Sequence, residues 1–532
     1  MAHVYPEGCV FNSLDDIAGK KVTVMGLGLN GGGEACVRFF LLHGAFVTVT
    51  DMKTREQLLP TINSIENDRM LDKSRLRYVL GEHRMEDFSD AFCVIKNPGV
   101  KIEGNKYLQS ARAIETDLSI FLKFTKAPII AVTGSKGKSS TVSAIEYGLK
   151  SAGFKVFLGG NITVSPLTFL HKTDGTTPVV LELSSWQLAD LRGRKLLKPK
   201  ISIITKIVPD HQNWYGAMDP YVDDKKLIYA DQTEKDFTIL DFDEDDYLTE
   251  TANPKEGCKC WGDVFASETK ATVLRYSKKI LPDGVWGAYQ VKTRCEGIKG
   301  YIRIPLSLTN PKADSQTIVE ENVMGELLVP GQHMKINVLN AALVMHIMGI
   351  VPQLTLSILG QWKGIQHRLE RCHDWVCETT KRKFAFYNDT CATVPEATAA
   401  ATQAFDQSVV LVAGGTDKGL DFDFLAQSLA KKELHHYRPY EIYLLSGTGT
   451  DKLTALLDQF SVKYVGPFDS LQMLLGIMKT NMMEPNHDKV YGPFFEKNYI
   501  PVVFSPGATS FGMFTNEFDR GNKFKDLVRS IF

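Results

Sequence analysis

The sequence predicts an α/β protein of three domains, each built on a mainly parallel sheet. Its 532 residues exceed what a single hydrophobic core normally organises. Apolar strand-like runs alternate with helical patterns along most of the chain, as in KVTVMG (21–26), VVLELS (179–184) and VVLVAGG (409–415). Strands that alternate with helices favour crossover connections, and crossover connections favour parallel sheets.

Composition and charge exclude several classes of protein. The 61 basic and 62 acidic residues leave a net charge of −1, so we expect neither nucleic acid nor a membrane as a partner. The N-terminal residues lack a basic segment followed by an apolar run, and no apolar stretch approaches bilayer length. Nine scattered cysteines favour free thiols in a reduced, cytoplasmic chain over disulfides or zinc sites.

The first domain is expected to cover residues 1–116. It opens with the strand KVTVMG, continues through a turn into a helix that ends in apolar residues, and returns in the strand FVTVTD (46–51). The third domain is expected to cover 365–532. Its strands include VVLVAGG, EIYLLSG (441–447) and IPVVFSPG (500–507), which repeat the α/β rhythm.

The central domain is expected to cover 117–364. Its strands include APIIAVTG (127–134), VVLELS and ISIITK (201–206), and it closes with a helix over 334–349 and a shorter one after Pro352. The pattern loosens between about 241 and 325, where we expect added strands and loops at the surface.

A glycine-rich turn, GLGLNG (26–31), follows the first strand and precedes a helix. This G-x-G-x-x-G spacing lets the backbone and the helix N-terminus approach a diphosphate, which indicates a Rossmann-like domain. Asp51 closes the next strand, where a carboxylate can accept hydrogen bonds from a ribose or a base. The motif alone does not distinguish NAD from a UDP-sugar, and a plain strand–helix turn is the other interpretation.

A second glycine turn, TGSKGKS (133–139), follows the first central strand. It is a shortened P-loop, in which turn amides would hold phosphates, Lys138 would reach the outer ones and Ser139 could bind Mg²⁺. Glu182 and His211 follow two further strands of the same domain. Each alone has an ordinary structural explanation, but three strand ends that offer these groups predict a metal–phosphate site.

These motifs together resemble a known family. TGSKGKS, LELSSWQL (181–188), PDHQNWY (209–215) and GIQHRLE (364–370) are similar, in that order, to signatures of the Mur ligases. GLGLNG, SPGATSFGMF (505–514) and FDRGNKF (518–524) most resemble the members that add glutamate. The resemblance covers nearly the whole chain apart from 241–325.

The resemblance implies that the first domain binds the UDP of a sugar–peptide substrate instead of NAD. Its contacts would come from the strand ends of that domain and one central loop: Gly28, Leu29, Asn30, Asp51, Met52, Lys53, Asn97, Pro98, Gly99 and Asn161. Met52 and Lys53 replace a Thr and an Arg of well-known members, and Asn97 stands in a serine position.

The resemblance also implies an ATP site with two Mg²⁺ ions. ATP would contact the phosphate loop and three later residues: Gly134, Ser135, Lys136, Gly137, Lys138, Ser139, Ser140, Asn337, Arg368 and Asp389. The metal ligands would be Ser139, Glu182, His211 and Lys225, with Lys225 carbamylated by CO₂. Lys138, His211 and Lys225 would be the catalytic residues. Lys226 is the nearest alternative to Lys225, and Met334 replaces an asparagine expected near the adenine.

For the amino acid, the resemblance implies contacts from Thr393, Lys418, Ser510 and Phe511. The family commonly has a lysine where this chain has Cys391, so Lys418 would carry more of the recognition of the glutamate carboxylates. The implied reaction is ATP-dependent addition of D-glutamate to UDP-N-acetylmuramoyl-L-alanine through an acyl phosphate, for cell-wall synthesis in the cytoplasm. We expect the enzyme to be a monomer.

Several alternatives stay open from the sequence. Another Mur-type ligase could use L-glutamate or a different amino acid. A folylpolyglutamate-synthetase-like enzyme would keep the two later domains, but such enzymes lack the first. An NAD-dependent oxidoreductase with an accessory ATP domain and a nucleotide-sensing module are the other two interpretations.

Overall fold

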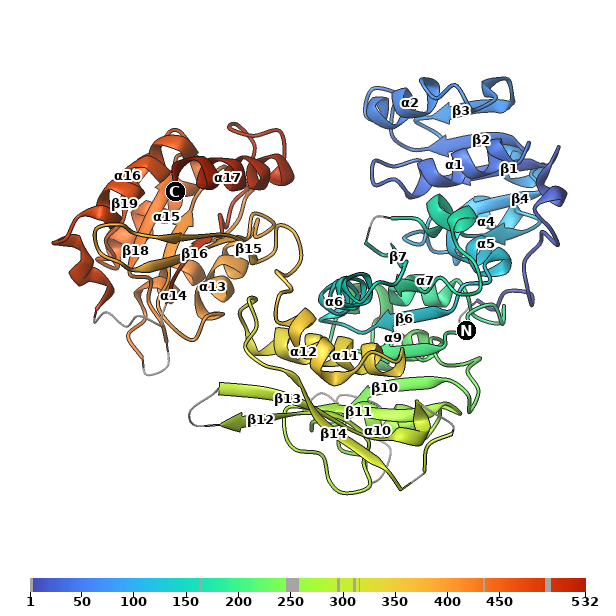
Figure 1. Ribbon diagram of the computed structural model, residues 1–532. Coiled ribbons are helices and arrows are strands. Elements are labelled where there is room, and N and C mark those ends of the chain that lie inside the picture. The colour runs from blue at the N-terminus through green and yellow to red at the C-terminus, as the bar shows by residue number, and fades with distance from the viewer. Residues whose placement is uncertain are drawn as a thin grey trace. The chain divides into compact units, whose positions relative to one another are not determined.

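The computed structural model describes residues 3–162, 164–244, 258–293, 297–309, 312–314, 316–433, 436–492 and 499–532. The chain packs as two compact units. The first contains residues 1–326 and 336–359, and the second contains 327–335 and 360–532. The first unit holds two sheets and the second holds one, and this α/β architecture confirms the predicted fold class (Figure 1). The three-domain boundaries stay a prediction.

The first sheet is parallel throughout the part that the structure describes. Its strands, in spatial order, are β3 (Leu76–Leu80), β2 (Phe46–Asp51), β1 (Lys21–Met25), β4 (Cys93–Lys96) and β5 (Ile114–Glu115). The helices of this part are α1 (Gly32–Leu42), α2 (Leu59–Glu66), α3 (Met85–Ser89), α4 (Lys106–Ser110) and α5 (Asp117–Phe124), with 3₁₀ turns at Asp15–Ile17 and Lys73–Arg75. The strand order reverses between β1 and β4, and ligands of open α/β sheets bind at such a point.

The central sheet begins with four parallel strands around the phosphate loop. In spatial order these are β9 (Ile201–Ile204), β6 (Ile129–Thr133), β8 (Val179–Glu182) and β7 (Phe157–Gly160). Every residue of β6 is buried, as expected of a parallel strand covered on both faces. Because β6 lies between β8 and β9, the loops that follow these three strands meet at one edge of the sheet.

The region that looks loose in sequence extends this sheet. β10 (Phe237–Asp241) and β11 (Thr272–Ser277) continue it in parallel, and β12 (Gly287–Thr293), β13 (Gly297–Pro305) and β14 (Ile318–Met324) follow in turn. Figure 1 shows β12, β13 and β14 together at one edge of the first unit. The last four residues of β11 are buried, so this region contributes to the core as well as to the surface.

Helices accompany the central sheet along its length. They are α6 (Lys138–Ser151), α7 (Ser185–Ala189), α8 (Gln212–Tyr215), α9 (Met218–Lys226), α10 (Trp261–Ala266), α11 (Gln332–Ile347) and α12 (Pro352–Leu359), with 3₁₀ turns at Pro166–Lys172 and Leu306–Leu308. Helix α12 packs against α6 and β14. A capping box between Ser184 and Gln187 starts α7. No helix among the described residues combines the length and the apolar character needed to cross a bilayer.

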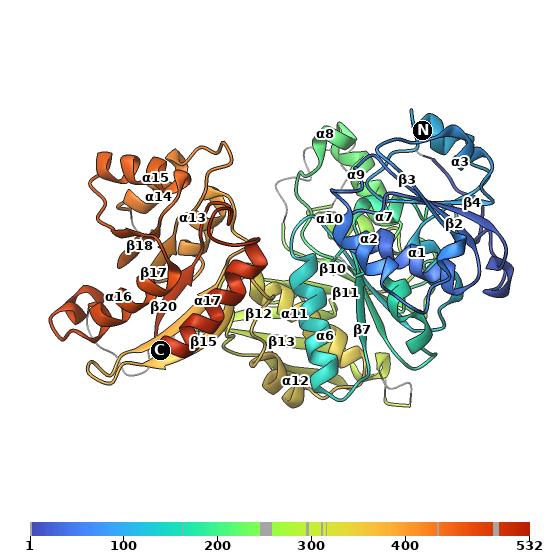
Figure 2. The same cartoon turned by 90° about the horizontal axis from the view of Figure 1, so that it is seen from above.

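The second unit is a sheet with a helical layer on each face. Its strands, in spatial order, are β15 (Glu370–Val376), β16 (Lys383–Asn388), β20 (Tyr499–Phe504), β17 (Val410–Ala413), β18 (Glu441–Leu445) and β19 (Val465–Phe468). Its helices are α13 (Pro395–Gln403), α14 (Asp423–Ala430), α15 (Thr448–Gln459), α16 (Leu471–Met483) and α17 (Glu517–Ile531), with a 3₁₀ turn at His487–Tyr491. Helix α17 packs against β15 and β16, and Figure 2 shows it alongside β15.

The alternation of β17 shows why both faces of this sheet are covered. Val410 and Val412 enter a core with residues of α16 and α17, whereas Leu411 and Ala413 enter a second core with residues of α13, α14 and α15. Successive side chains of a strand point to opposite faces, so an entirely apolar strand needs a partner layer on each side.

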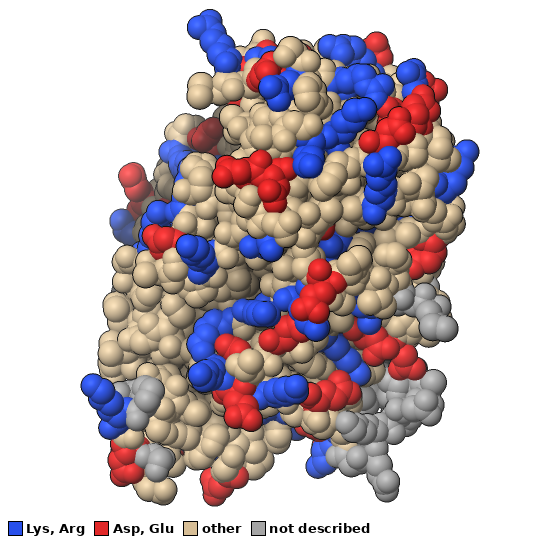
Figure 3. Space-filling view, turned by 90° about the vertical axis from the view of Figure 1, so that its right-hand side faces the viewer, with Lys and Arg blue, Asp and Glu red and all other residues tan. Residues whose placement is uncertain are grey.

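Figure 3 shows one face of the molecule, on which Lys and Arg side chains are interspersed with Asp and Glu side chains. Interspersed charges on this face do not sum to a strong field of one sign. The pattern agrees with the balanced net charge of −1.

Candidate functional site

The phosphate loop connects β6 to α6, and its two glycines are required by the backbone. Gly134 has φ +141°, and a Cβ there would lie 2.0 Å from Thr205 Oγ1. Gly137 has φ +95°, and a Cβ there would lie 2.5 Å from Asn337 Oδ1. Side chains rarely adopt these φ values, and both positions lack space for one. The loop is therefore packed tightly between the end of β9 and the first turns of α11, where the predicted ATP-site residue Asn337 lies.

The side chain of Lys138 folds back onto this loop and donates hydrogen bonds to it. Its Nζ donates to the carbonyl oxygens of Gly134, at 2.9 Å, and Ser135, at 3.2 Å. Burial lowers the pKa of Lys138, while the nearby charges of Glu182 and Asp210 act in the opposite direction. A cation held among carbonyl oxygens at a helix N-terminus is well placed to exchange those partners for phosphate oxygens.

Lys225 and Lys226 lie in different environments although they are neighbours on α9. The Lys225 side chain is buried, with 1% of the residue exposed, and its Nζ donates to Gly134 O at 2.9 Å. Lys226 forms ion pairs near the surface with Glu268, at 3.1 Å, and Asp223, at 3.5 Å. Only Lys225 thus reaches the phosphate loop.

The surroundings of Lys225 favour the neutral form of its amine. Burial lowers its pKa well below the ordinary value, and the positive charge of Lys138 acts in the same direction. Its Nζ also lies 4.5 Å from the centre of the Tyr221 ring. A neutral amine is a nucleophile, whereas an ammonium group is not.

Glu182 ends β8 beside the loop, and one of its oxygens has no protein partner. Its Oε1 accepts a hydrogen bond from Asn161 Nδ2 at 3.1 Å. Its Oε2 is buried and accepts no hydrogen bond within the described part of the chain. A buried carboxylate oxygen without a partner is costly, so the site suits a cation that a ligand would bring.

The residues at this edge suit a Mg²⁺ ion that shares its ligands between protein, water and substrate. They do not form a site built of protein ligands alone. Among the described residues, no three His, Cys, Asp or Glu side chains gather as a metal-binding group. Mg²⁺ typically takes one or two protein carboxylates and completes its shell with water and substrate phosphates. Glu182 and the partly buried Ser139 beside Lys138 offer oxygen ligands of this kind.

His211 lies at the start of α8, on the exposed side of this edge. Its φ is +53°, and its ring centre lies 4.8 Å from that of Trp186. The preceding residue, Asp210, forms an exposed ion pair of 3.4 Å with Lys136 of the phosphate loop. The metal role of His211 stays a prediction.

A pocket of about 530 Å³ follows the switch point of the first sheet. All the predicted UDP contacts except Asp51 and Met52 line it: Gly28, Leu29, Asn30, Lys53, Asn97, Pro98, Gly99 and Asn161. Ser184, Trp186 and Gln187 of the central part complete the wall on the other side. The pocket thus brings two predicted loops of the first sheet against the edge of the central sheet that carries Glu182.

Asp51 organises the glycine turn from beside the pocket. Its Oδ2 accepts hydrogen bonds from the amides of Leu27, at 2.9 Å, and Gly28, at 3.1 Å, and its Oδ1 accepts from Lys53 N at 2.9 Å. The carboxylate therefore already has three backbone partners, and a ligand would use its remaining lone pairs. Met52 is 63% exposed.

Gly33 allows α1 to start close to the turn. A Cβ at this position would lie 2.4 Å from the carbonyl oxygens of both Gly26 and Leu27. A larger residue would push the helix N-terminus away from the turn, and that N-terminus is the part of α1 that attracts a diphosphate.

Arg368 and Asp389 belong to the second unit. Asp389 follows β16 and is buried; its Oδ2 accepts from Ser505 Oγ at 2.7 Å and its Oδ1 from Leu369 N at 3.1 Å. Burial raises the pKa of Asp389 to about 7, and Arg368 acts against that rise. Arg368 itself is exposed.

The predicted amino-acid contacts follow three adjacent strands of the second unit, β16, β20 and β17. Lys418 Nζ lies 3.4 Å from Thr393 Oγ1, and the Thr416 hydroxyl donates to the Phe511 carbonyl. Ser510 is buried, and Phe511 is 66% exposed. The fold therefore places Lys418 beside Thr393 and joins their strand end to the segment that holds Ser510 and Phe511.

Cys391 lies close to charged groups of this same unit. Burial raises the pKa of its thiol; Arg368 acts against the rise, and Asp389 and Glu517 add to it. Arg368 is therefore a cation near the position where the resemblance predicts a lysine. Lys452 of α15 forms an ion pair of 2.5 Å with Asp417, the residue before Lys418.

Sequence reasoning missed the partners that hold the phosphate loop in place. Tyr221 donates to Ser135 Oγ at 2.8 Å, and Ser135 Oγ in turn donates to Val208 O at 2.9 Å. Thr205 fills the space beside Gly134. Tyr221 could have been found, because it precedes Lys225 by four residues and therefore shares its helix face.

Two family models match this chain. The Mur ligase middle domain family matches residues 132–345, and the family of Mur ligase MurD-like N-terminal domains matches residues 20–119. These two ranges contain the phosphate loop and the glycine turn, respectively.

Full-length relatives are similar over almost the whole chain. A protein of Treponema pallidum (strain Nichols) named UDP-N-acetylmuramoylalanine–D-glutamate ligase is 39% identical over 97% of this chain and 98% of its own. Proteins with that name from Borreliella afzelii (strain PKo) and Borreliella burgdorferi (strain ZS7) are each 36% identical over 97% of this chain and 99% of theirs. A crystal structure of MurF from Acinetobacter baumannii has a similar fold, with a TM-score of 0.51 and 13% identity over 91% of this chain and 90% of its own.

Proposed function

The chain belongs to the Mur ligase family, and we propose that it is the ATP-dependent ligase that joins D-glutamate to UDP-N-acetylmuramoyl-L-alanine in peptidoglycan precursor synthesis. The single observation that carries this proposal is the hydrogen bond from Asn161 to Glu182. Asn161 lines the pocket of the glycine turn, and Glu182 ends the strand beside the phosphate loop. One continuous site can therefore hold a sugar nucleotide at one end and present its reacting group to ATP phosphates at the other.

The proposed reaction has two steps. The carboxylate of the substrate's alanine attacks the γ-phosphorus of ATP, which forms an acyl phosphate and releases ADP. The amine of glutamate then attacks the acyl carbon, loses a proton and expels inorganic phosphate through a tetrahedral intermediate. Neither step needs a redox cofactor, so the protein must chiefly position the reactants and neutralise charge.

Lys138 would supply positive charge to the outer phosphates, for which it would give up its bonds to the loop carbonyls. The amides of Ser135–Ser140 would contact the phosphates at the N-terminus of α6. Asn337, which packs on Gly137, would lie near the nucleotide. Arg368 and Asp389, in the second unit, would contact the phosphates and the ribose.

Mg²⁺ would neutralise the charge that accumulates on the phosphates during transfer. Ser139, Glu182 and His211 are the residues that we assign to hold two such ions. The unpaired Oε2 of Glu182 supports this assignment, because it needs a cation or a donor. The carbamate of Lys225 would be the remaining ligand.

The surroundings of Lys225 support the proposed carbamylation. A neutral amine adds to CO₂ and releases one proton, which converts a base into an anion. The burial of Lys225 and its strongly lowered pKa favour the neutral amine. The resulting carbamate would remove a positive charge from beside Lys138 and provide oxygen ligands next to Gly134.

Glutamate is the proposed amino acid, and Lys418 is the cation that would pair with one of its carboxylates. Thr393 lies beside Lys418, and Ser510 and Phe511 would complete the pocket. The printed names of the full-length relatives support the D isomer. We place the enzyme in the cytoplasm, where ATP is available, and expect a monomer.

The test is ADP release by the purified chain with UDP-N-acetylmuramoyl-L-alanine, Mg²⁺ and a panel of amino acids that includes D-glutamate, L-glutamate and neutral amino acids. We expect release only when the sugar nucleotide and D-glutamate are both present. Absence of release with every amino acid would overturn the proposal. A preference for another amino acid would revise the pocket and leave the ligase chemistry in place.

A further inference from the structure

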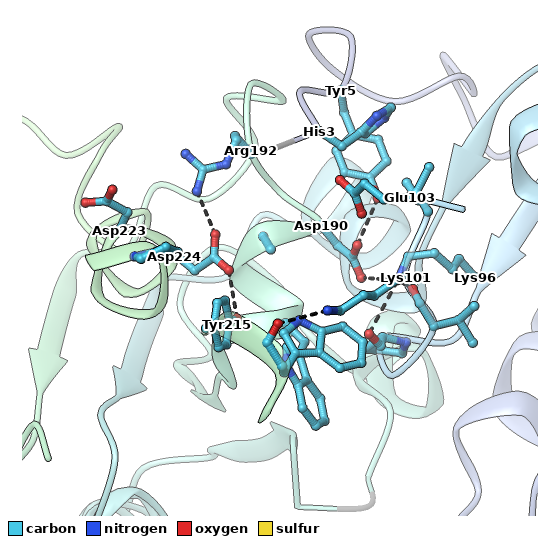
Figure 4. A pocket seen from close by; sticks show the side chains of 17 residues that line it. His3, Tyr5, Lys96, Lys101, Glu103, Asp190, Arg192, Tyr215, Asp223 and Asp224 are labelled. Carbon is cyan, nitrogen blue, oxygen red and sulfur yellow. Dashed lines mark hydrogen bonds and ion pairs between the residues drawn. The ribbon is translucent and has the colours of Figure 1, made fainter. Parts of the chain in front are cut away.

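A buried ion pair joins Lys96, which lines the sugar-nucleotide pocket, to Asp190. Figure 4 shows the pair in a second pocket, which shares Lys96, Pro98 and Trp186 with the first. Lys96 is the last residue of β4, and Asp190 directly follows α7. Lys96 Nζ lies 2.9 Å from Asp190 Oδ2, and the two side chains are only 2% and 8% exposed. Neither residue belongs to the predicted site.

The Lys96 amine contacts one turn through three carbonyl oxygens. Its Nζ donates to the carbonyl oxygens of Asn97, at 3.1 Å, Pro98, at 3.4 Å, and Val100, at 2.9 Å. Asn97, Pro98 and Gly99 line the sugar-nucleotide pocket. Carbonyl oxygens that are gathered on a cation do not face an anionic diphosphate, which they would repel. Lys96 therefore holds this turn in a shape that accepts the substrate.

Asp190 ties that cation to the opposite wall. Helix α7 begins beside Ser184, and Trp186 and Gln187 within it line the same pocket as the turn. Tyr5 OH donates to Asp190 Oδ1 at 2.8 Å, so residues near the N-terminus also hold the carboxylate. Burial raises the pKa of Asp190 to about 6, and Lys96 is the main group that opposes this rise. A carboxyl with this pKa is mostly ionised near neutral pH.

A positioning role accounts for this pair better than a purely stabilising one. Removing two charges from water costs so much that apolar residues of similar size often give an equally stable protein. A buried pair is therefore weak evidence of a contribution to stability. The three directed donors of Lys96 are a specific arrangement that apolar residues could not reproduce.

We propose that Lys96 is a positioning residue for the sugar-nucleotide substrate, fixed by Asp190 and holding the turn at 97–100 against the pocket. This role rests on the proposed function, because it concerns the same substrate. Lys96 lines the pocket, but its side chain is only 2% exposed, so we assign its effect to the turn that it holds. Its loss should weaken binding of the sugar nucleotide and leave the ATP site unchanged.

The test compares Lys96→Met with the double variant Lys96→Met/Asp190→Asn. The single variant leaves Asp190 buried without its partner and should lower the melting temperature. The double variant removes both charges and should recover most of that stability. We expect both variants to raise the dissociation constant of UDP-N-acetylmuramoyl-L-alanine about tenfold or more by titration calorimetry, the scale of lost hydrogen bonds from a charged group. The Michaelis constant for ATP should change less than twofold.

A second buried pair in the same unit provides the matched control. Arg194 and Glu115 also join the central part to the first sheet, at 2.9 Å and with side chains 2% and 3% exposed. Arg194 donates to Ile114 O and Asp190 O, and no hydrogen bond described for it reaches the turn at 97–100. Arg194→Met/Glu115→Gln should alter the melting temperature without changing affinity for the sugar nucleotide.

The outcomes separate the two proposals. If the Lys96→Met/Asp190→Asn variant binds the sugar nucleotide as tightly as wild type, the pair is only structural and the positioning role is overturned. Equal weakening by the control pair would overturn it as well, because general rigidity would then explain both. Wild-type protein that neither binds the sugar nucleotide nor releases ADP would instead overturn the proposed function, and this role with it.

Discussion

The amine of Lys225 donates a hydrogen bond of 2.9 Å to the carbonyl oxygen of Gly134, 91 residues earlier in the chain. This contact brings α9 against the phosphate loop, where Tyr221 of the same helix bonds to Ser135. The loop is therefore supported by a helix that the local motif does not contain. The Lys225 amine is buried, and its pKa is strongly lowered. Burying a basic group costs folding free energy, and a structural role alone would not require a lysine there.

Lys138→Ala is expected to abolish ADP release, by a factor of about a hundred or more, which is typical when a charge-stabilising group is removed from an active site. The fold should persist, since Lys138 bonds only to carbonyls of its own loop in the described structure. ADP release by a coupled assay and the melting temperature check both points. Lys150→Ala, on the same helix and paired at the surface with Glu146, is the control and should be active. Near-normal turnover by a folded Lys138→Ala protein would exclude the ATP assignment.

Lys225→Ala should be nearly inactive and partly rescued by small carboxylates such as acetate, because an added anion can replace a carbamate. Lys226→Ala should be mild, since Lys226 forms ion pairs with Glu268 and Asp223 near the surface and does not reach the loop. ADP release with and without acetate measures the effect, and a ¹³C resonance from ¹³CO₂ would detect the carbamate in wild type. If Lys226→Ala were nearly inactive and Lys225→Ala mild, Lys226 would be the carbamylated residue instead.

Lys418→Ala should raise the Michaelis constant for glutamate about tenfold, because a glutamate carboxylate would lose its charged partner. The Michaelis constant for ATP should change much less. The matched control is Lys452→Ala. Lys452 lies close by, but its charge is already balanced by Asp417 at 2.5 Å. Steady-state kinetics with each substrate varied in turn separate the two constants. Equal changes in both constants for Lys418→Ala would argue against a direct contact with the amino acid.

Cys391→Lys should retain activity or lower the Michaelis constant for glutamate, because it restores a cation at a position where relatives commonly have one. Asp389 and Glu517 act on the Cys391 thiol and would also interact favourably with an ammonium group. Cys391→Ser removes the thiol without adding charge and should leave the constant near the wild-type value. A well-folded but inactive Cys391→Lys, together with a preference for L-glutamate or a neutral amino acid, would contradict the glutamate pocket.

Asp389 should make stability depend on pH. Its folded pKa of about 7 lies above that of an unfolded aspartate, so the folded protein holds the extra proton between about pH 4 and 7. Its contribution to the free energy of unfolding is therefore full below about pH 4 and is lost as pH rises toward 7. Relative to wild type, Asp389→Asn should gain about 1–4 kcal/mol between pH 4 and 8.

Denaturant unfolding at several pH values, without ATP, measures that difference. Asp417→Asn is the control. A hydrogen bond from Lys452 lowers the pKa of the partly buried Asp417, so its titration lies below this window. The difference between Asp417→Asn and wild type should then stay flat from pH 5 to 8. A flat difference for Asp389→Asn would mean that the carboxyl is ionised throughout.

The sequence alone predicted the fold class and the position of both glycine turns between a strand and a helix, because each motif is local. A buried strand, a glycine that needs positive φ and a helix start lie within about ten residues of one another at both GLGLNG and TGSKGKS. The carboxyl ends of neighbouring parallel strands meet by geometry, so Ser139 and Glu182 could be assigned to one edge before the strand order was known.

The tertiary structure decided what depends on which face of an element is packed. Lys225 and Lys226 are adjacent in sequence and about 100° apart around a helix, and only the packing of α9 on the phosphate loop separates a buried amine from a surface ion pair. The partners of Lys96 and the unpaired oxygen of Glu182 likewise come from contacts between segments far apart in the chain. Local pattern determines where a strand ends and a turn begins, whereas burial and charge pairing depend on distant neighbours that only the folded chain brings together.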